Sequence, residues 1–269
     1  MRERERAGLV GCSAWIAGRL VVSLDDARAA VAGGGRTDGG KRATLPIDPS
    51  FGPARIPRAD RATQLVATAV ARALTGIDAS LGDATGVITA SVLASADTND
   101  QFERRRLTGR PAAPRSFPYT APNATAGELS MALRARGPTT ALAGGAEVGV
   151  AAVALACSWL EDGDAERVVV AAYECPAEPA PPWLGGPGPH VECAVALVLD
   201  AVPSGGSLRI GAYWMDRTDA VRESRDDWRS RCGSVGPLLP IVGAARARTP
   251  TSVVVVGDAG GGVRLELSE

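Results

Sequence analysis

The chain has 269 residues, of which 45% are hydrophobic and 22% charged, and 29 basic against 30 acidic side chains give a formal net charge of -1. This composition is ordinary for a globular protein, and the length suits one large domain or two small ones. The charge balance and an aromatic content of 4% argue against nucleic acid or an anionic membrane as a partner.

The first half of the chain alternates apolar strand patterns with segments that have helix start and stop signals. Residues 7–16 predict a buried strand, and the Gly- and Pro-rich region 25–58 predicts loop. Asp60 is the expected N-cap of a helix over 60–76, which Gly76 ends. Further strands are predicted at 85–91 and 138–145, and further helices at 98–107, 122–137 and 146–163.

The second half continues this alternation. Residues 166–174 form a near-continuous apolar run, typical of a strand covered on both faces of its sheet. After a Pro/Gly loop at 175–190, we expect strands at 191–200 and 207–215, helices at 219–231 and 238–248, and two strands within 253–267. Strands alternating with helices predict an α/β fold, and no repeat or linker divides the chain.

The cysteines and the single histidine do not have the spacing of a metal site. Five cysteines without CxxC spacing predict free thiols in a reducing cytoplasm, namely Cys12, Cys157, Cys175, Cys193 and Cys232. With only His190 beside them, we expect no zinc and no other cofactor. No apolar run approaches the roughly 20 residues of a membrane span. Arg19 interrupts the N-terminal apolar stretch, so no signal peptide is expected.

Three local patterns suggest chemistry that their context disfavours. The glycines within 253–263 follow a strand as in a dinucleotide loop, but a strand rather than a helix comes next, which favours a hairpin. Cys157 lies about three turns inside a predicted helix, where a packed thiol is favoured over a nucleophile. The arginines at 104–106 suit a solvated helix face, with contact to an acidic carrier protein as the weaker alternative.

A string of motifs resembles the ketosynthase branch of the thiolase superfamily. DRATQLVATAVARAL, TGVITAS and PNATAGELSMALRARGP resemble successive segments of that family, and GPTTALAGGAEVGVAAVALA aligns without gaps to its strand, nucleophile turn and helix. In VECAVALVLD, Glu192 matches the glutamate of the family's Gly-Glu-Gly element. The resemblance covers about residues 7–215. It implies one thiolase-like layered α/β domain over 1–269, with a nearly complete N-terminal half (1–200) and a reduced C-terminal half (201–269).

The resemblance also implies that the catalytic cysteine is missing. In ketosynthases the tenth position of the Gly-Pro block is cysteine, and here it is Ala146. A methyl group cannot form a thioester, so we expect no catalytic residue at this place. From residue 201 onward the chain also has no histidine and no lysine, the groups that ketosynthases place in their second half. The pattern is similar to chain length factors, the partner subunits of type II polyketide ketosynthases, in which this cysteine is also replaced.

If this resemblance holds, the chain forms a heterodimer with a ketosynthase and shapes a channel for the acyl chain delivered by an acyl carrier protein. In this superfamily the strand before the nucleophile pairs across the dimer axis, which predicts partner contacts at Thr139, Thr140, Ala141 and Leu142, with Phe117, Tyr119 and Asn123 nearby. Channel candidates lie on the matching helix and at the nucleophile position, namely Asp97, Asp100, Phe102, Arg104 and Ala146. A shortened subunit is compatible with an aryl-polyene type of product.

Two other functions stay open. One is a thiolase-fold acyltransferase or hydrolase that uses Cys175, Cys193 or His190. The other is a homodimeric scaffold without an acyl ligand. Ordinary packing of Phe117, Tyr119 and Asn123 is as compatible with the sequence as an interface role.

Overall fold

The computed structural model describes ten segments of the chain, residues 7–32, 42–52, 54–77, 83–111, 113–177, 191–201, 208–215, 232–249, 251–256 and 262–268. The predicted helix at 219–231, His190 and most of the predicted loop at 175–190 lie outside these ranges. Among the described helices, none is both long and apolar enough to cross a bilayer.

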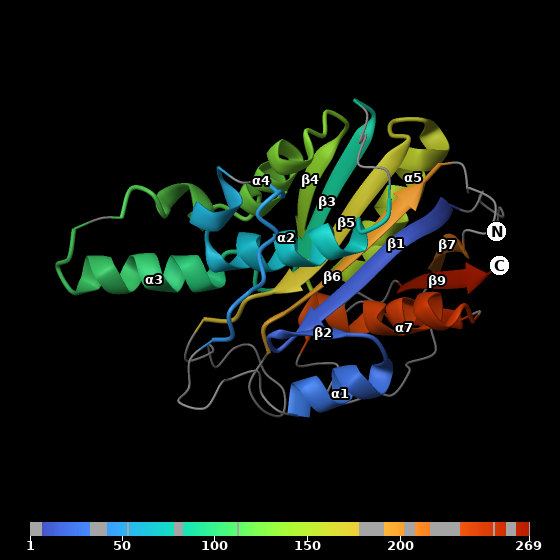
Figure 1. Ribbon diagram of the computed structural model, residues 1–269, viewed down its shortest axis with the longest axis horizontal. Coiled ribbons are helices and arrows are strands. Elements are labelled where there is room, and N and C mark those ends of the chain that lie inside the picture. Colours follow the sequence, from blue (N-terminus) through green and yellow to red (C-terminus); the bar gives the residue numbers. More distant parts are fainter. Residues whose placement is uncertain are drawn as a thin grey trace.

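One mixed sheet organises the described segments (Figure 1). Its strand order is β4-β3-β5-β6-β1-β7-β9-β8, with β2 paired to β1. β3 is parallel to both β4 and β5, whereas the other pairs are antiparallel. The strands are β1 Ala7–Ile16, β2 Arg19–Val21, β3 Thr85–Ser91, β4 Thr139–Ala143, β5 Arg167–Glu174, β6 Cys193–Asp200, β7 Leu208–Met215, β8 Thr251–Val256 and β9 Gly262–Ser268.

Helices cover both faces of this sheet (Figure 1). The α-helices are α1 Leu24–Ala32, α2 Arg61–Ala73, α3 Ala96–Leu107, α4 Ala124–Leu133, α5 Val148–Asp162 and α7 Leu239–Ala247, and the short 3-10 helices are η1 Ile56–Arg58, η2 Phe117–Thr120 and η4 Gly233–Leu238. Buried side chains of α2 and α4 belong to one core, and those of α1, α5 and α7 to the other. α3 extends away from the sheet.

β5 shows why the sheet needs two covered faces. Val168, Val170 and Ala172 lie in the core with α5, whereas Val169 and Ala171 lie in the core with α2. Successive side chains of a strand point to opposite faces, so a continuous apolar run has both sides buried. The predicted α/β fold and doubly covered strand are therefore confirmed.

Most predicted elements are present, but the loop prediction for the first part of the chain is wrong. The loop predicted for 25–58 includes α1, in which Ala27, Ala30 and Val31 are buried at helical spacing. Alanine side chains are small, so this apolar face gives a weak pattern in the sequence. The hairpin prediction is confirmed, because β8 and β9 pair antiparallel.

Helix ends follow the predicted chemistry in part. Asp60 caps α2 by accepting a hydrogen bond from the backbone N–H of Thr63 at 3.0 Å. Gly163, at φ +77°, ends α5 as expected. The helix predicted to reach Gly137 instead ends at Arg134, which has φ +54°. Gly137 serves the next strand, because a Cβ there would lie 2.6 Å from the carbonyl oxygen of Thr85.

Two helical glycines give a matched test of packing between α5 and η4. We expect Gly149→Ala to destabilise the protein by about 1–3 kcal/mol, because the added Cβ would collide with the carbonyl oxygen of Ser234. The control is Gly127→Ala in α4, where nothing lies within 4 Å and alanine should stabilise by about 0.5–1 kcal/mol. Urea unfolding followed by circular dichroism measures both. Equal changes would show that α5 and η4 are not in tight contact.

Candidate functional site

The candidate site begins at β4, which forms one edge of the sheet. β4 pairs with β3 in the register Val87↔Thr139 to Ser91↔Ala143, and no second strand pairs with it in the described part of the chain. Thr139 is exposed, and Thr140, Ala141 and Leu142 are partly buried. An edge strand of this kind presents backbone N–H and C=O groups that another strand can pair with.

Ala146 lies in the turn between β4 and α5. Its side chain is exposed, and Glu147 occupies the N-cap position of α5 without a side-chain cap bond. The N-terminus of a helix favours a thiolate, so the position suits a nucleophilic cysteine. The methyl group of Ala146 has no such chemistry. The place expected for the nucleophile is therefore accessible and inert.

The described cysteines are packed rather than activated. Cys157 is buried in α5 with its Sγ 4.0 Å from the carbonyl oxygen of Ile210, which confirms that it is a core thiol. Cys175 and Cys193 are fully buried, and burial raises the pKa of both thiols well above the usual value. A raised pKa removes the thiolate that nucleophilic chemistry needs at neutral pH.

The channel candidates on α3 have partners within the chain. The carboxylate of Asp97 is buried and accepts two hydrogen bonds of 2.7 Å from Arg42. Asp100 accepts a hydrogen bond of 2.6 Å from Arg104. Phe102 contacts Phe117, with ring centroids 6.1 Å apart. These contacts explain the polar character of α3, because its first turn is tied to the protein body and its second half is exposed.

The interface candidates gather around β4, η2 and α4. Phe117 is 64% exposed, and Asn123 is exposed at the start of α4 without a side-chain cap bond. Tyr119 is partly buried, and its hydroxyl donates to Glu128 at 3.3 Å. The sequence analysis missed Met131 of α4, which is 49% exposed. A hydrogen bond of 3.0 Å between the hydroxyls of Ser130 and Thr139 joins α4 to β4.

A buried carboxylate, also missed by the sequence analysis, lies at the end of β5. Glu174 has no exposed surface and accepts hydrogen bonds from the backbone N–H groups of Val92, Leu93 and Ser234 and from the hydroxyls of Ser91 and Ser234. Burial raises the pKa of Glu174, and these hydrogen bonds oppose the rise. Glu174 thereby fixes the loop that leads to α3 and the start of η4.

A second carboxylate fixes the start of β6. Glu192, at the position that resembles the family's Gly-Glu-Gly glutamate, accepts hydrogen bonds of 2.9 and 2.6 Å from Arg61. Arg61 also donates to the carbonyl oxygen of Ala43.

No group of His, Cys, Asp and Glu side chains suited to a metal ion occurs among the described residues.

The ion pair at the base of α3 should matter more than a pair on its surface. We expect Arg42→Ala to cost on the order of 2 kcal/mol, because it leaves Asp97 buried with its main cationic partner removed. The control Arg106→Ala breaks an exposed pair with Glu103 and should cost roughly 0–1 kcal/mol. Chemical unfolding at pH 7 compares them. Similar losses would contradict a structural role for the Arg42–Asp97 pair.

The buried thiols should react slowly with a thiol reagent. We expect Cys157, Cys175 and Cys193 to resist Ellman's reagent at pH 8 in the folded protein and to react in denaturant, because burial blocks access and disfavours the thiolate. Cys12 is only partly buried and is the internal comparison. Peptide mass spectrometry after brief labelling assigns the sites. Rapid labelling of Cys175 or Cys193 would contradict this expectation and would favour an enzyme that uses one of those thiols.

Comparisons of sequence and structure show which proteins this chain is similar to. A family model described as beta-ketoacyl synthase, N-terminal domain, matches residues 104–232. No curated protein matches the chain in sequence. A solved structure described as the ishigamide ketosynthase/chain length factor matches with a TM-score of 0.73 at 17% identity, over 98% of this chain and 99% of that chain.

Two further solved structures have the same fold. One is the ketosynthase ApeO in complex with its chain length factor ApeC from Xenorhabdus doucetiae, with a TM-score of 0.64 at 15% identity over 99% of this chain and 100% of that chain. The other is AntDE:AntF, a type II PKS acyl-carrier protein in complex with its ketosynthase bound to the hexaketide, with a TM-score of 0.73 at 16% identity over 98% of this chain and 99% of that chain. The chain therefore has the thiolase-like fold of these ketosynthase and chain length factor structures, and its residues 104–232 match the beta-ketoacyl synthase N-terminal domain model.

Proposed function

We propose that this chain is a non-catalytic partner subunit of a type II ketosynthase, similar to a chain length factor. The observation that carries the proposal is Ala146, an exposed methyl group at the turn where a ketosynthase of this fold would need its cysteine. The chain also has no histidine and no lysine from residue 201 onward. A subunit without these groups contributes shape and contacts rather than covalent chemistry.

The surface around β4 supports a partner of the same fold. The edge strand offers backbone groups for pairing, α4 beside it exposes Met131, and η2, which contacts α4, exposes Phe117. A ketosynthase that pairs its own edge strand with β4 would satisfy the backbone groups and cover the apolar side chains. Two similar structures are described as a ketosynthase with its chain length factor, which favours a heterodimer over a homodimer.

We further propose that α3 forms part of the wall of an acyl channel at this interface. Phe102 and Phe117 form the apolar contact between α3 and η2, and Asp100 and Arg104 neutralise each other. Wall side chains would limit chain length by their size. The acyl chain would arrive on an acyl carrier protein, in a cytoplasmic complex. The single domain would keep a nearly complete first half (1–200) and a reduced second half (201–269).

The other two functions make different demands on the molecule. An acyltransferase or hydrolase that uses Cys175 or Cys193 would need a thiolate, whereas burial raises the pKa of both thiols. His190 lies outside the described residues. A homodimeric scaffold would pair β4 with a second copy of itself and would need no ketosynthase.

Co-expression with a ketosynthase encoded at the same genomic locus tests the proposal. We expect a one-to-one complex by size exclusion with light scattering, and condensation activity that requires both chains. After incubation with acyl and malonyl carrier protein, intact mass should show the acyl group on the ketosynthase alone. A stable homodimer that ignores the ketosynthase would favour the scaffold, and an acyl adduct on this chain would favour an enzyme.

A point variant tests whether Phe117 lies in the interface with the ketosynthase. We expect Phe117→Asp to weaken the complex at least about tenfold, because it puts a charge into an apolar interface. The matched control is Val22→Asp, another exposed apolar residue, which lies just after β2 and should leave affinity unchanged. Titration of the labelled ketosynthase measures both affinities. Equal affinity of the two variants would place the interface elsewhere.

A further inference from the structure

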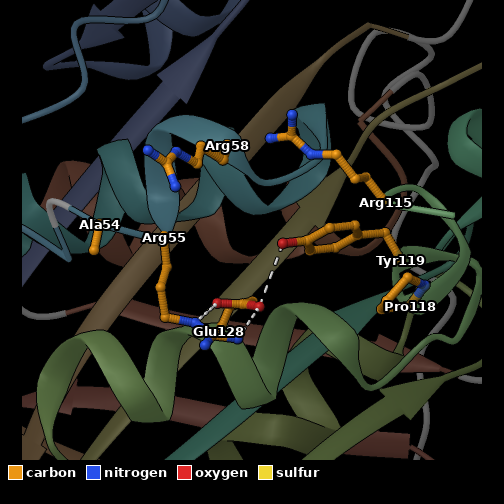
Figure 2. Close-up of a pocket in the computed structure, with 7 residues that line it drawn as sticks. All are labelled: Ala54, Arg55, Arg58, Arg115, Pro118, Tyr119 and Glu128. Carbon is orange, nitrogen blue, oxygen red and sulfur yellow. Dashed lines mark hydrogen bonds and ion pairs between the residues drawn. The ribbon is translucent and has the colours of Figure 1, made fainter. Parts of the chain in front are cut away.

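A pocket separate from the Ala146 turn opens between the segment 54–58, η2 and α4. Its volume is about 520 Å³, and its lining includes Arg55, Arg58, Arg115, Tyr119 and Glu128. Figure 2 shows Arg58 and Arg115 on one side of the Tyr119 ring and the Arg55–Glu128 pair on the other. Three arginines from two distant segments therefore share one pocket with a single carboxylate.

The carboxylate in this pocket is fully engaged by one arginine. Glu128 accepts hydrogen bonds of 2.7 and 2.8 Å from Arg55, and a third from the hydroxyl of Tyr119. The hydrogen bond from Arg55 lowers the pKa of Glu128, so Glu128 is ionised at neutral pH and its charge cancels that of Arg55. The Arg55–Glu128 pair therefore adds no net positive charge to the pocket.

Two positive charges remain in the pocket. Arg58 and Arg115 are exposed, and neither guanidinium group has an ion pair or a hydrogen bond to another residue in the described ranges. Each guanidinium presents N–H donors in a planar fork that fits a phosphate or a carboxylate. A phosphate monoester carries a charge of about -1.5 to -2 at pH 7 and several acceptor oxygens, which matches two unpaired guanidinium groups.

We propose that this pocket binds a phosphate monoester between Arg58 and Arg115. The apolar parts of Tyr119 and Pro118 line the pocket beside these arginines and provide a surface for the rest of the ligand. The volume is sufficient for a small phosphorylated molecule or a phosphorylated side chain, so both sources share one chemistry. This inference does not depend on the proposed function, because it uses neither Ala146 nor β4.

Calorimetric titration with O-phospho-L-serine tests the site on the chain in the form in which it purifies, alone or with its ketosynthase. We expect one-to-one binding in wild type and a loss of at least about tenfold in Arg58→Gln/Arg115→Gln. The matched control Arg28→Gln/Arg209→Gln removes two exposed charges from α1 and β7 and should bind like wild type. If wild type does not bind, or if both double variants weaken equally, the proposal is wrong.

Two further arms separate phosphate recognition from simple charge. Malonate, a dianion with carboxylates, should bind at least about tenfold more weakly than phosphoserine, and equal binding would contradict a phosphate site in favour of a general acidic surface. A phosphoserine hexapeptide that binds more tightly than the free amino acid would identify a protein-borne phosphate, and the reverse would identify a small molecule. If the double variant unfolds, Arg58→Lys/Arg115→Lys keeps both charges without the forks and should still weaken binding.

Discussion

The arrangement of the candidate site depends on one buried carboxylate, Glu174. Glu174 is the last residue of β5, at the end of the sheet where the parallel strand β3 also ends. Its five hydrogen bonds hold the loop after β3 and the start of η4. A buried carboxylate that lost these donors would carry a large desolvation cost. Burial raises the pKa of Glu174 in the folded protein above its usual value. The contribution of Glu174 to stability therefore falls as pH rises from the usual pKa of a glutamate to the raised one. The five hydrogen bonds offset the cost of desolvating Glu174 and fix the positions of the loop after β3 and of η4.

The loop and the 3-10 helix that Glu174 holds are in turn connected to α3 and α5. η4 packs against α5 so closely that Gly149 has no room for a side chain, and the loop after β3 leads directly into α3. The first turn of α3 is fixed again by Arg42 and Asp97, and β6 by Arg61 and Glu192. The elements around the Ala146 turn are therefore held by several hydrogen bonds and close contacts.

The sequence predicted the elements with strong local signals and missed those that depend on distant contacts. β3 matches its predicted bounds, because a short apolar run with two buried faces has few alternatives. α1 was missed because its buried face is mostly alanine. The partners of Asp97 and Glu174 were not predictable, since Arg42 and Ser234 lie 55 and 60 residues away along the chain. The place of Ala146 at the junction of a strand and a helix was predictable, because both elements have strong local patterns.

The same distinction bears on how polar residues should be interpreted. In the sequence, Asp97, Asp100 and Arg104 look out of place on the wall of an apolar channel. In the structure, Asp97 supports the base of α3 and the Asp100–Arg104 pair lies on its exposed part, so neither needs to face an acyl chain. Under the proposed function, the apolar contact between Phe102 and Phe117 is the part of α3 best suited to line an acyl channel. Phe117 is also exposed, so under the proposed function a change there would alter both partner binding and channel shape. The two effects separate only when affinity and product length are measured on the same variant.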